Sequence, residues 1–215
     1  MSAPVQLYPA LEAYLDERAL EVDAISADRR SRLERLADFI AARRAAELPC
    51  ALTFVCTHNS RRSHLAQLWA TAAARRVGLA GVETYSGGIE RTAFEPRAVE
   101  TLRWAGFRIE AATSGPNPEY RVWFSDDAPP ATCFSKLLDE PPNPRADFAA
   151  VLVCADVDAR CPTVPGAAAV IALPYDDPKS ADGTPQESAI YDERCRQIAR
   201  EMLWTMSSVI ERLGR

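Results

Sequence analysis

The sequence predicts an α/β domain in which helices flank a parallel sheet of four strands, and three observations support this fold class. Short apolar runs with β-branched residues alternate with amphipathic helical patterns, which is the order of βαβ units. Glycine and proline stand where helices are expected to begin or end, at Gly78, Pro96 and Gly106. The chain has 215 residues, 47% hydrophobic and 26% charged, which suits a globular domain with a substantial core.

Residues 1–48 precede the first expected strand and are predicted to form a helical extension. Leu11 and Leu15 fall on one face of a first helix, and Ser26 is placed to cap a second helix that ends at Pro49. We favour a helical cap that packs on the domain. The alternatives are a homodimer interface and a docking element for a partner.

Residues 49–215 are expected to form the α/β domain. Its strands are predicted at residues 51–55, 82–86, 148–154 and 169–173, and its helices at residues 63–77, 95–106 and 187–213. Residues 110–146 interrupt this order with several prolines, which break any long helix. We expect them to be a surface insertion near the site entrance, with short strands at residues 120–124 and 132–137 that form a hairpin.

A loop between the first strand and its helix carries Cys56 and Arg62, separated by five residues. Such a loop points backbone N–H groups into one concavity and adds the positive end of the helix dipole. The same field stabilises the Cys56 thiolate, and the Arg62 fork can hold two oxygens of an anion. Ser63 can donate to the thiolate, and Asn59 is a residue type that tolerates a left-handed turn.

This loop therefore predicts a nucleophilic cysteine beside a site for a tetrahedral oxyanion. The expected oxyanion-binding residues are Thr57, His58, Asn59, Ser60, Arg61 and Ser63. The alternative is a buried core cysteine followed by a helix start with solvated arginines, because cysteine is a common core residue.

Two more cysteines, Cys154 and Cys161, follow the third expected strand. In a parallel sheet, the end of that strand lies beside the end of the first strand, where Cys56 stands. If the segment between the two cysteines were helical, their Cα atoms would lie about 10 Å apart, whereas a disulfide needs less than about 7 Å. A disulfide would thus require a change of shape, which indicates a redox switch. Two packed thiols or half of a zinc site are the alternatives, although the usual Cys-x2-Cys spacing is absent.

A carboxylate that follows the fourth strand is placed to reach the anion and to act as a general acid. Asp177, which is followed by Pro178, is the better candidate, and Asp176 is expected to be solvated. An Asp-Asp-Pro turn is also common in loops without any catalytic role. His58 and His64 have no evident metal partner, so both are expected to be loop or surface groups, and no metal site is predicted.

Composition and charge narrow the classes of partner. A net charge of −5 without a stripe of basic residues argues against nucleic acid. No apolar run approaches the ~18 residues of a membrane span, and the first residues show no signal-peptide pattern. We therefore expect a cytoplasmic protein that binds no membrane. Its six cysteines should be mostly reduced there, which favours catalytic or redox use.

Four segments together resemble the thioredoxin-coupled arsenate reductases, whose flavodoxin-like fold is shared with low molecular weight protein tyrosine phosphatases. The segments are VCTHNSRRSHLAQ, YSGGIERTAFEPRAVETLRWAGFRI, VLVCADVDARCP and YDDP. The resemblance covers roughly residues 50–112 and 147–213. Cys-x5-Arg-Ser combined with Cys-x6-Cys-Pro is specific to the reductases, and Lys179 stands where phosphatases tend to carry an aromatic residue.

The resemblance implies a relay of three thiols. Cys56 would attack arsenate held by the loop amides and Arg62, while Asp177 protonates the departing water. Cys154 would then attack Cys56 and release arsenite, and Cys161 would move the disulfide to Cys154–Cys161. Thioredoxin would reduce that disulfide, so it is the expected electron donor, and no tightly bound cofactor is expected.

The chain departs from the family pattern at three positions. Family loops usually carry glycine in place of His58 and a cysteine in place of Arg61. Gln67 stands where reductases tend to carry a glutamate that helps to hold a cation. The cysteines without an assigned role are Cys50, Cys133 and Cys195.

Two other functions remain open from the sequence. Without the relay thiols, the same loop would transfer phosphoryl groups through a cysteinyl-phosphate, as a phosphatase for phosphotyrosine or small phosphoesters. The second is a non-catalytic oxyanion or redox sensor that contacts a partner through the N-terminal helices. It would bind arsenate or phosphate without turnover.

Overall fold

The computed structural model describes residues 6–154 and 164–214. The N-terminal elements are helix α1 (Pro9–Ala19), the 3-10 turn η1 (Val22–Ala24) and helix α2 (Ala27–Ala45). The central elements are β1 (Cys50–Cys56), α3 (Arg62–Arg76), β2 (Val82–Gly88), α4 (Pro96–Trp104), β3 (Arg108–Ala111), β4 (Tyr120–Trp123) and β5 (Ala131–Cys133). The last elements are β6 (Phe148–Leu152), β7 (Ala167–Ala172), η2 (Pro178–Ala181) and α6 (Glu187–Arg212).

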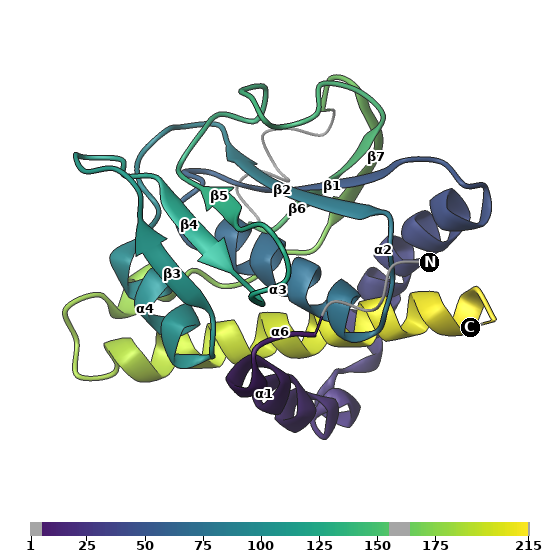
Figure 1. The fold of residues 1–215 in the computed structure, drawn as a ribbon, viewed down its shortest axis with the longest axis horizontal. Helices are drawn as coiled ribbons and strands as arrows, with labels where there is room; N and C mark the ends of the chain where they lie inside the picture. Colours follow the sequence, from purple (N-terminus) through teal and green to yellow (C-terminus); the bar gives the residue numbers. More distant parts are fainter. Residues whose placement is uncertain (1–5, 155–163, 215) are drawn as a thin grey trace.

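Four strands form the predicted parallel sheet, in the order β2-β1-β6-β7. Cys56 pairs with Gly88 across β1 and β2, so the carboxyl ends of both strands meet at one edge. Figure 1 shows α3 between the sheet and α6, and α1 on the far side of α6, and α3 contacts both β1 and β2. The predicted fold class is thereby confirmed. None of the helices formed by the described residues has the length and apolar content needed to cross a bilayer.

The third core strand is shorter than the sequence predicts. β6 ends at Leu152 rather than Cys154, although Val153 N–H still donates to the carbonyl of Val55. On the opposite side, the N–H of Tyr175 donates to the carbonyl of Val153. Single hydrogen bonds therefore continue the sheet beyond the regular ladder and fix the chain that carries the expected site residues.

The predicted hairpin forms from β4 and β5, but its second strand ends at Cys133 and not at Leu137. A further strand, β3, pairs antiparallel with β4 and makes a second sheet of three strands. β3 was not predicted, because it is four residues long and only Ile109 in it is buried. The chain after β5 leaves the hairpin because it hydrogen-bonds to Gly88 at the end of β2.

The N-terminal helices bury their apolar faces within the chain itself. Ser26 caps α2 as predicted, since its hydroxyl accepts a hydrogen bond from the N–H of Arg29 at 3.3 Å. The side chains of Leu11, Leu15 and Leu36 are completely buried in the same core as α6. The two helices therefore cover part of the domain core.

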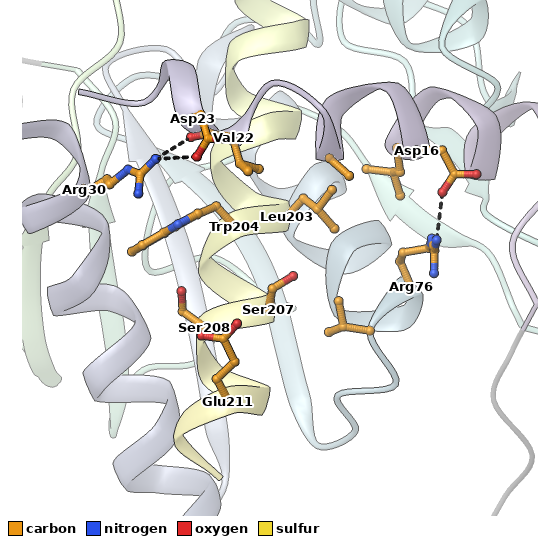
Figure 2. A pocket seen from close by; sticks show the side chains of 13 residues that line it. Asp16, Val22, Asp23, Arg30, Arg76, Leu203, Trp204, Ser207, Ser208 and Glu211 are labelled. Carbon is orange, nitrogen blue, oxygen red and sulfur yellow. Dashed lines mark hydrogen bonds and ion pairs between the residues drawn. The ribbon is translucent and has the colours of Figure 1, made fainter. Parts of the chain in front are cut away.

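A cavity of about 450 Å³ remains between these helices and the body of the protein. Figure 2 shows Leu203 and Trp204 of α6 in its wall. Asp16 of α1 pairs with Arg76 at the end of α3 at 2.7 Å, on one side of the cavity. This ion pair adds a polar contact to the apolar one between the extension and the domain.

The buried face of α2 makes a prediction about stability. We expect Leu36→Ala to lower the free energy of unfolding by about 2–5 kcal/mol, because it leaves a cavity in a completely buried site. Leu20→Ala is the control, with a side chain that is 87% exposed and an expected change of at most about 0.5 kcal/mol. Urea unfolding followed by circular dichroism measures both. A midpoint for Leu36→Ala equal to that of the wild type would show that α2 is not part of the cooperative core.

Candidate active site

The loop of residues 56–62 lies at the carboxyl edge of the sheet, and its carbonyl groups are bonded outward. Neighbouring segments supply the donors: Ile89 and Glu90 N–H to Thr57, the hydroxyls of Thr92 and Ser135 to His58, and Glu95 N–H to Ser60, all at 2.8–3.1 Å. Among the described residues, none accepts a hydrogen bond from the N–H groups of residues 57–61. Outward carbonyls and free N–H groups at a helix N-terminus form an anion-binding concavity.

Cys56 is buried at the start of this loop. The hydroxyl of Ser63 lies beside its sulfur and is held there by Asn59. The Cys56 Sγ lies 3.1 Å from Ser63 Oγ, which also accepts a hydrogen bond from Asn59 Nδ2 at 2.8 Å. The bond from Asn59 does not use the hydroxyl hydrogen of Ser63, which can be donated to the sulfur. Asn59 has a φ of +43°, so the left-handed turn predicted there is confirmed.

Arg62 is 8% exposed and meets the segment that follows β7. Its Nη2 lies 2.6 Å from Asp177 Oδ2, its Nη1 donates to the carbonyl of Tyr175 at 3.0 Å, and its buried Nε has no partner among the described residues. Asp176 instead points to solvent and pairs with Arg194. The structure thus brings Asp177, and not Asp176, to the loop, and an oxyanion could satisfy the remaining donor.

Cys154 lies two residues after the end of β6, beside the end of β1. Its Sγ is completely buried and 3.5 Å from Thr57 Oγ1, the hydroxyl of the residue after Cys56. Adjacent strand ends bring these residues together, as expected for a parallel sheet. Cys161, the third expected thiol, lies outside the described residues.

The guanidinium of Arg61 contacts groups outside the loop. It donates to Tyr191 Oη at 2.7 Å and pairs with Glu95 and Asp182 at 2.9 and 3.1 Å. Burial opposes its charge, but the bond to Tyr191 and the nearby carboxylates hold its pKa above the usual value. The sequence predicts Arg61 among the oxyanion-binding residues, whereas its side chain links the loop to α4, α6 and the segment after η2. Its backbone N–H has no acceptor among the described residues.

His64 lies in the core of the protein. The expectation of a surface group is wrong, because its ring is completely buried and stacks on Phe94 at 4.0 Å. Its Nε2 donates to the carbonyl of Phe134 at 3.3 Å, and burial with the nearby Lys136 charge lowers its pKa to about 3. The other histidine, His58, is a partly exposed loop group with its Nε2 3.2 Å from Glu90.

The insertion supplies support that sequence reasoning missed. The Ser135 hydroxyl donates to the loop carbonyl of His58, and Lys136 N–H donates to Asn59 Oδ1 at 3.0 Å. Asn117 bonds both backbone groups of Ser135 and so fixes it. The Lys136 side chain is almost completely buried, which lowers its pKa. A lysine in a stretch that also holds Phe134, Leu137 and Leu138 is the one sign of this burial in the sequence.

The other three described cysteines are buried, and Gln67 is bound to the backbone of β2. Burial raises the pKa of Cys50 to about 11 and those of Cys133 and Cys195 to about 12, so these thiols are poor nucleophiles. Gln67 Nε2 donates to the carbonyl of Thr84 at 3.1 Å. In the part of the chain that the structure describes, no three His, Cys, Asp or Glu side chains gather as metal ligands would.

The fold and the anion loop are similar to those of the low molecular weight phosphatases. The family model "Low molecular weight phosphotyrosine protein phosphatase" matches residues 51–121. A solved low molecular weight phosphotyrosine phosphatase from Vibrio cholerae O395 superimposes with a TM-score of 0.50 and 11% identity, over 77% of this chain and 99% of that one. This likeness shows the shared fold.

Comparison with curated proteins narrows the class. The arsenate reductase of Bacillus licheniformis is 30% identical over 150 residues, which cover 70% of this chain and 89% of that protein. The arsenate reductase of Bacillus subtilis strain 168 is 29% identical over 145 residues, or 66% and 84% of the two chains. This chain therefore belongs to the arsenate reductase family within the low molecular weight phosphatase superfamily.

The buried His64 predicts a pH dependence of stability. Its folded-state pKa of about 3 lies below the unfolded value of about 6.5, so the unfolded state binds the extra proton between these values. The contribution of neutral His64 to the free energy of unfolding is fully present above about pH 6.5, and it is lost as the pH is lowered toward 3. Between pH 7.5 and 4.5 we expect the wild type to lose on the order of 2 kcal/mol more than His64→Gln. Urea unfolding at both pH values tests this, with His58→Gln as the control; equal losses in wild type and His64→Gln would refute it.

Proposed function

We propose that the protein reduces arsenate to arsenite through a cysteine thiolate and a disulfide relay. The observation that carries the proposal is the pairing of two buried thiols with one anion loop. Cys56 stands at the loop start, and Cys154 lies 3.5 Å from the hydroxyl of the next residue, Thr57. A phosphatase needs the first thiol alone, whereas reduction of arsenic needs a second thiol to take up the oxidation. The family membership of the chain supports the same activity.

The first step uses the loop and the acid. Arsenate would enter the concavity of N–H groups and take the place of the Asp177 carboxylate on Arg62. It would also reach the Arg62 Nε, which has no partner in the part of the chain that the structure describes. Cys56 attacks arsenic and forms a sulfur–arsenic bond, while Asp177, once protonated, gives its proton to the departing water. The Ser63 hydroxyl supports the thiolate before the attack.

The second step transfers the electrons. Cys154 attacks the sulfur of Cys56, a disulfide forms, and the electron pair of the sulfur–arsenic bond stays on arsenic, which leaves as arsenite. Cys161 then attacks Cys154, frees Cys56 and leaves a Cys154–Cys161 disulfide. We propose a thioredoxin-like protein as the reductant of that disulfide. The five described cysteines are free thiols, which suits a reducing compartment such as the cytoplasm.

The relay is tested by arsenate-dependent NADPH consumption with thioredoxin and thioredoxin reductase. We expect Cys56→Ser, Cys154→Ser and Cys161→Ser each to lower kcat by about 10³-fold or more, because each removes a bond-forming sulfur. Cys133→Ser is the matched control, a buried thiol with no place in the relay, and it should keep kcat within about threefold.

Two other results would assign another function. Without arsenate turnover, p-nitrophenyl phosphate hydrolysis that survives Cys154→Ser and Cys161→Ser but not Cys56→Ser would make the protein a phosphatase. Binding of arsenate or phosphate without turnover in either assay would make it a sensor.

A further inference from the structure

Arg29, in the first turn of α2, reaches from the N-terminal extension to the segment that carries the proposed general acid. We call residues 173–177 the acid segment. Arg29 Nη1 donates to the carbonyl of Pro174 at 2.9 Å, and its guanidinium carbon lies 4.4 Å from the centre of the Tyr175 ring. One side chain of the extension thus holds both the backbone and the aromatic ring of the acid segment.

Arg29 is itself fixed by a buried carboxylate of α6. Its Nε and Nη2 both donate to Glu201 Oε2, at 2.9 and 2.7 Å, and Glu201 is 1% exposed. Gln197 holds the other oxygen of that carboxylate at 3.0 Å. Although burial opposes its charge, Tyr175 and Glu201 keep the pKa of Arg29 above the usual value. A paired and largely buried fork has few orientations, so it is a rigid support.

The anion loop grips the same segment from the other side. Arg62 donates to the carbonyl of Tyr175 and pairs with Asp177. Two successive carbonyls, those of Pro174 and Tyr175, are therefore bonded by two arginines from different parts of the chain. Asp177 lies two residues further on, so a displacement of these carbonyls would displace its carboxylate.

We propose that Arg29 is a positioning residue for Asp177, which makes the N-terminal extension a working part of the active site. The inference rests on the proposed arsenate reduction, in which Asp177 protonates the departing water. Arg29 touches no reacting atom and acts through the backbone of Pro174. Small displacements of a catalytic group lower rates strongly, so loss of Arg29 should lower kcat by about 10–100-fold.

The test uses a double variant, because Arg29→Met alone would leave Glu201 buried without a partner. We expect Arg29→Met with Glu201→Met to lower kcat for arsenate by about 10–100-fold, with KM within about threefold, since the loop N–H groups and Arg62 remain. The single variant Arg29→Lys should lose less kcat than the double variant. The matched control is Arg43→Met, also in α2, whose pair with Asp147 lies away from the acid segment; it should keep the wild-type kcat.

A cycle with Asp177→Asn separates positioning from a general loss of structure. If Arg29 acts through Asp177, the double variant should lower kcat at most about threefold further when Asp177 is already replaced. An equal fold-loss in both backgrounds, or a wild-type kcat in the folded double variant, would overturn the inference.

Failure of the proposed function has a different signature, namely a wild-type protein without arsenate turnover. The same cycle is then measured on phenyl phosphate, whose phenolate leaving group also needs a proton. Inactivity of the wild type on both compounds would overturn the inference together with the function.

Discussion

The site depends on one constraint, which is that the carbonyl groups of the anion loop must turn away from its centre. Each outward carbonyl needs a donor, and several segments supply one: the chain after β2, the start of α4 and the insertion. Gly88 is required there, because a Cβ would lie 2.7 Å from Asn59 N and 2.9 Å from the Thr57 carbonyl oxygen. The concavity of free N–H groups is therefore a product of the segments around the loop.

Charge around the loop follows a second constraint, that a buried cation requires a partner. Arg61 and Arg62 are neighbours in sequence but have different partners. Arg61 is satisfied by Tyr191, Glu95 and Asp182, so its charge stabilises the frame of the site. Arg62 pairs with Asp177, and its buried Nε has no partner within residues 6–154 and 164–214. This difference makes Arg62 the arginine that an arriving oxyanion can share.

The N-terminal helices and the segment of residues 110–146 both contact the site region. Lys136 of the insertion orients Asn59, which in turn holds Ser63 beside the nucleophile. Arg29 of α2 bonds the segment that presents Asp177. One of these regions thus supports the anion loop and the other supports the acid segment, in the way that outer hydrogen bonds orient catalytic groups.

The sequence by itself determined the parallel sheet, the loop of Cys56 and Arg62, the cap at Ser26 and the left-handed turn at Asn59. Each follows from local rules of periodicity, capping or backbone conformation, which neighbouring residues settle. The burial of His64, the partners of Arg61, the strand β3 and the contact of Arg29 with Pro174 were decided by tertiary structure. Arg29 and Pro174 are 145 residues apart, and Arg61 and Tyr191 are 130 apart. No local pattern encodes such pairs, because packing of distant elements selects them.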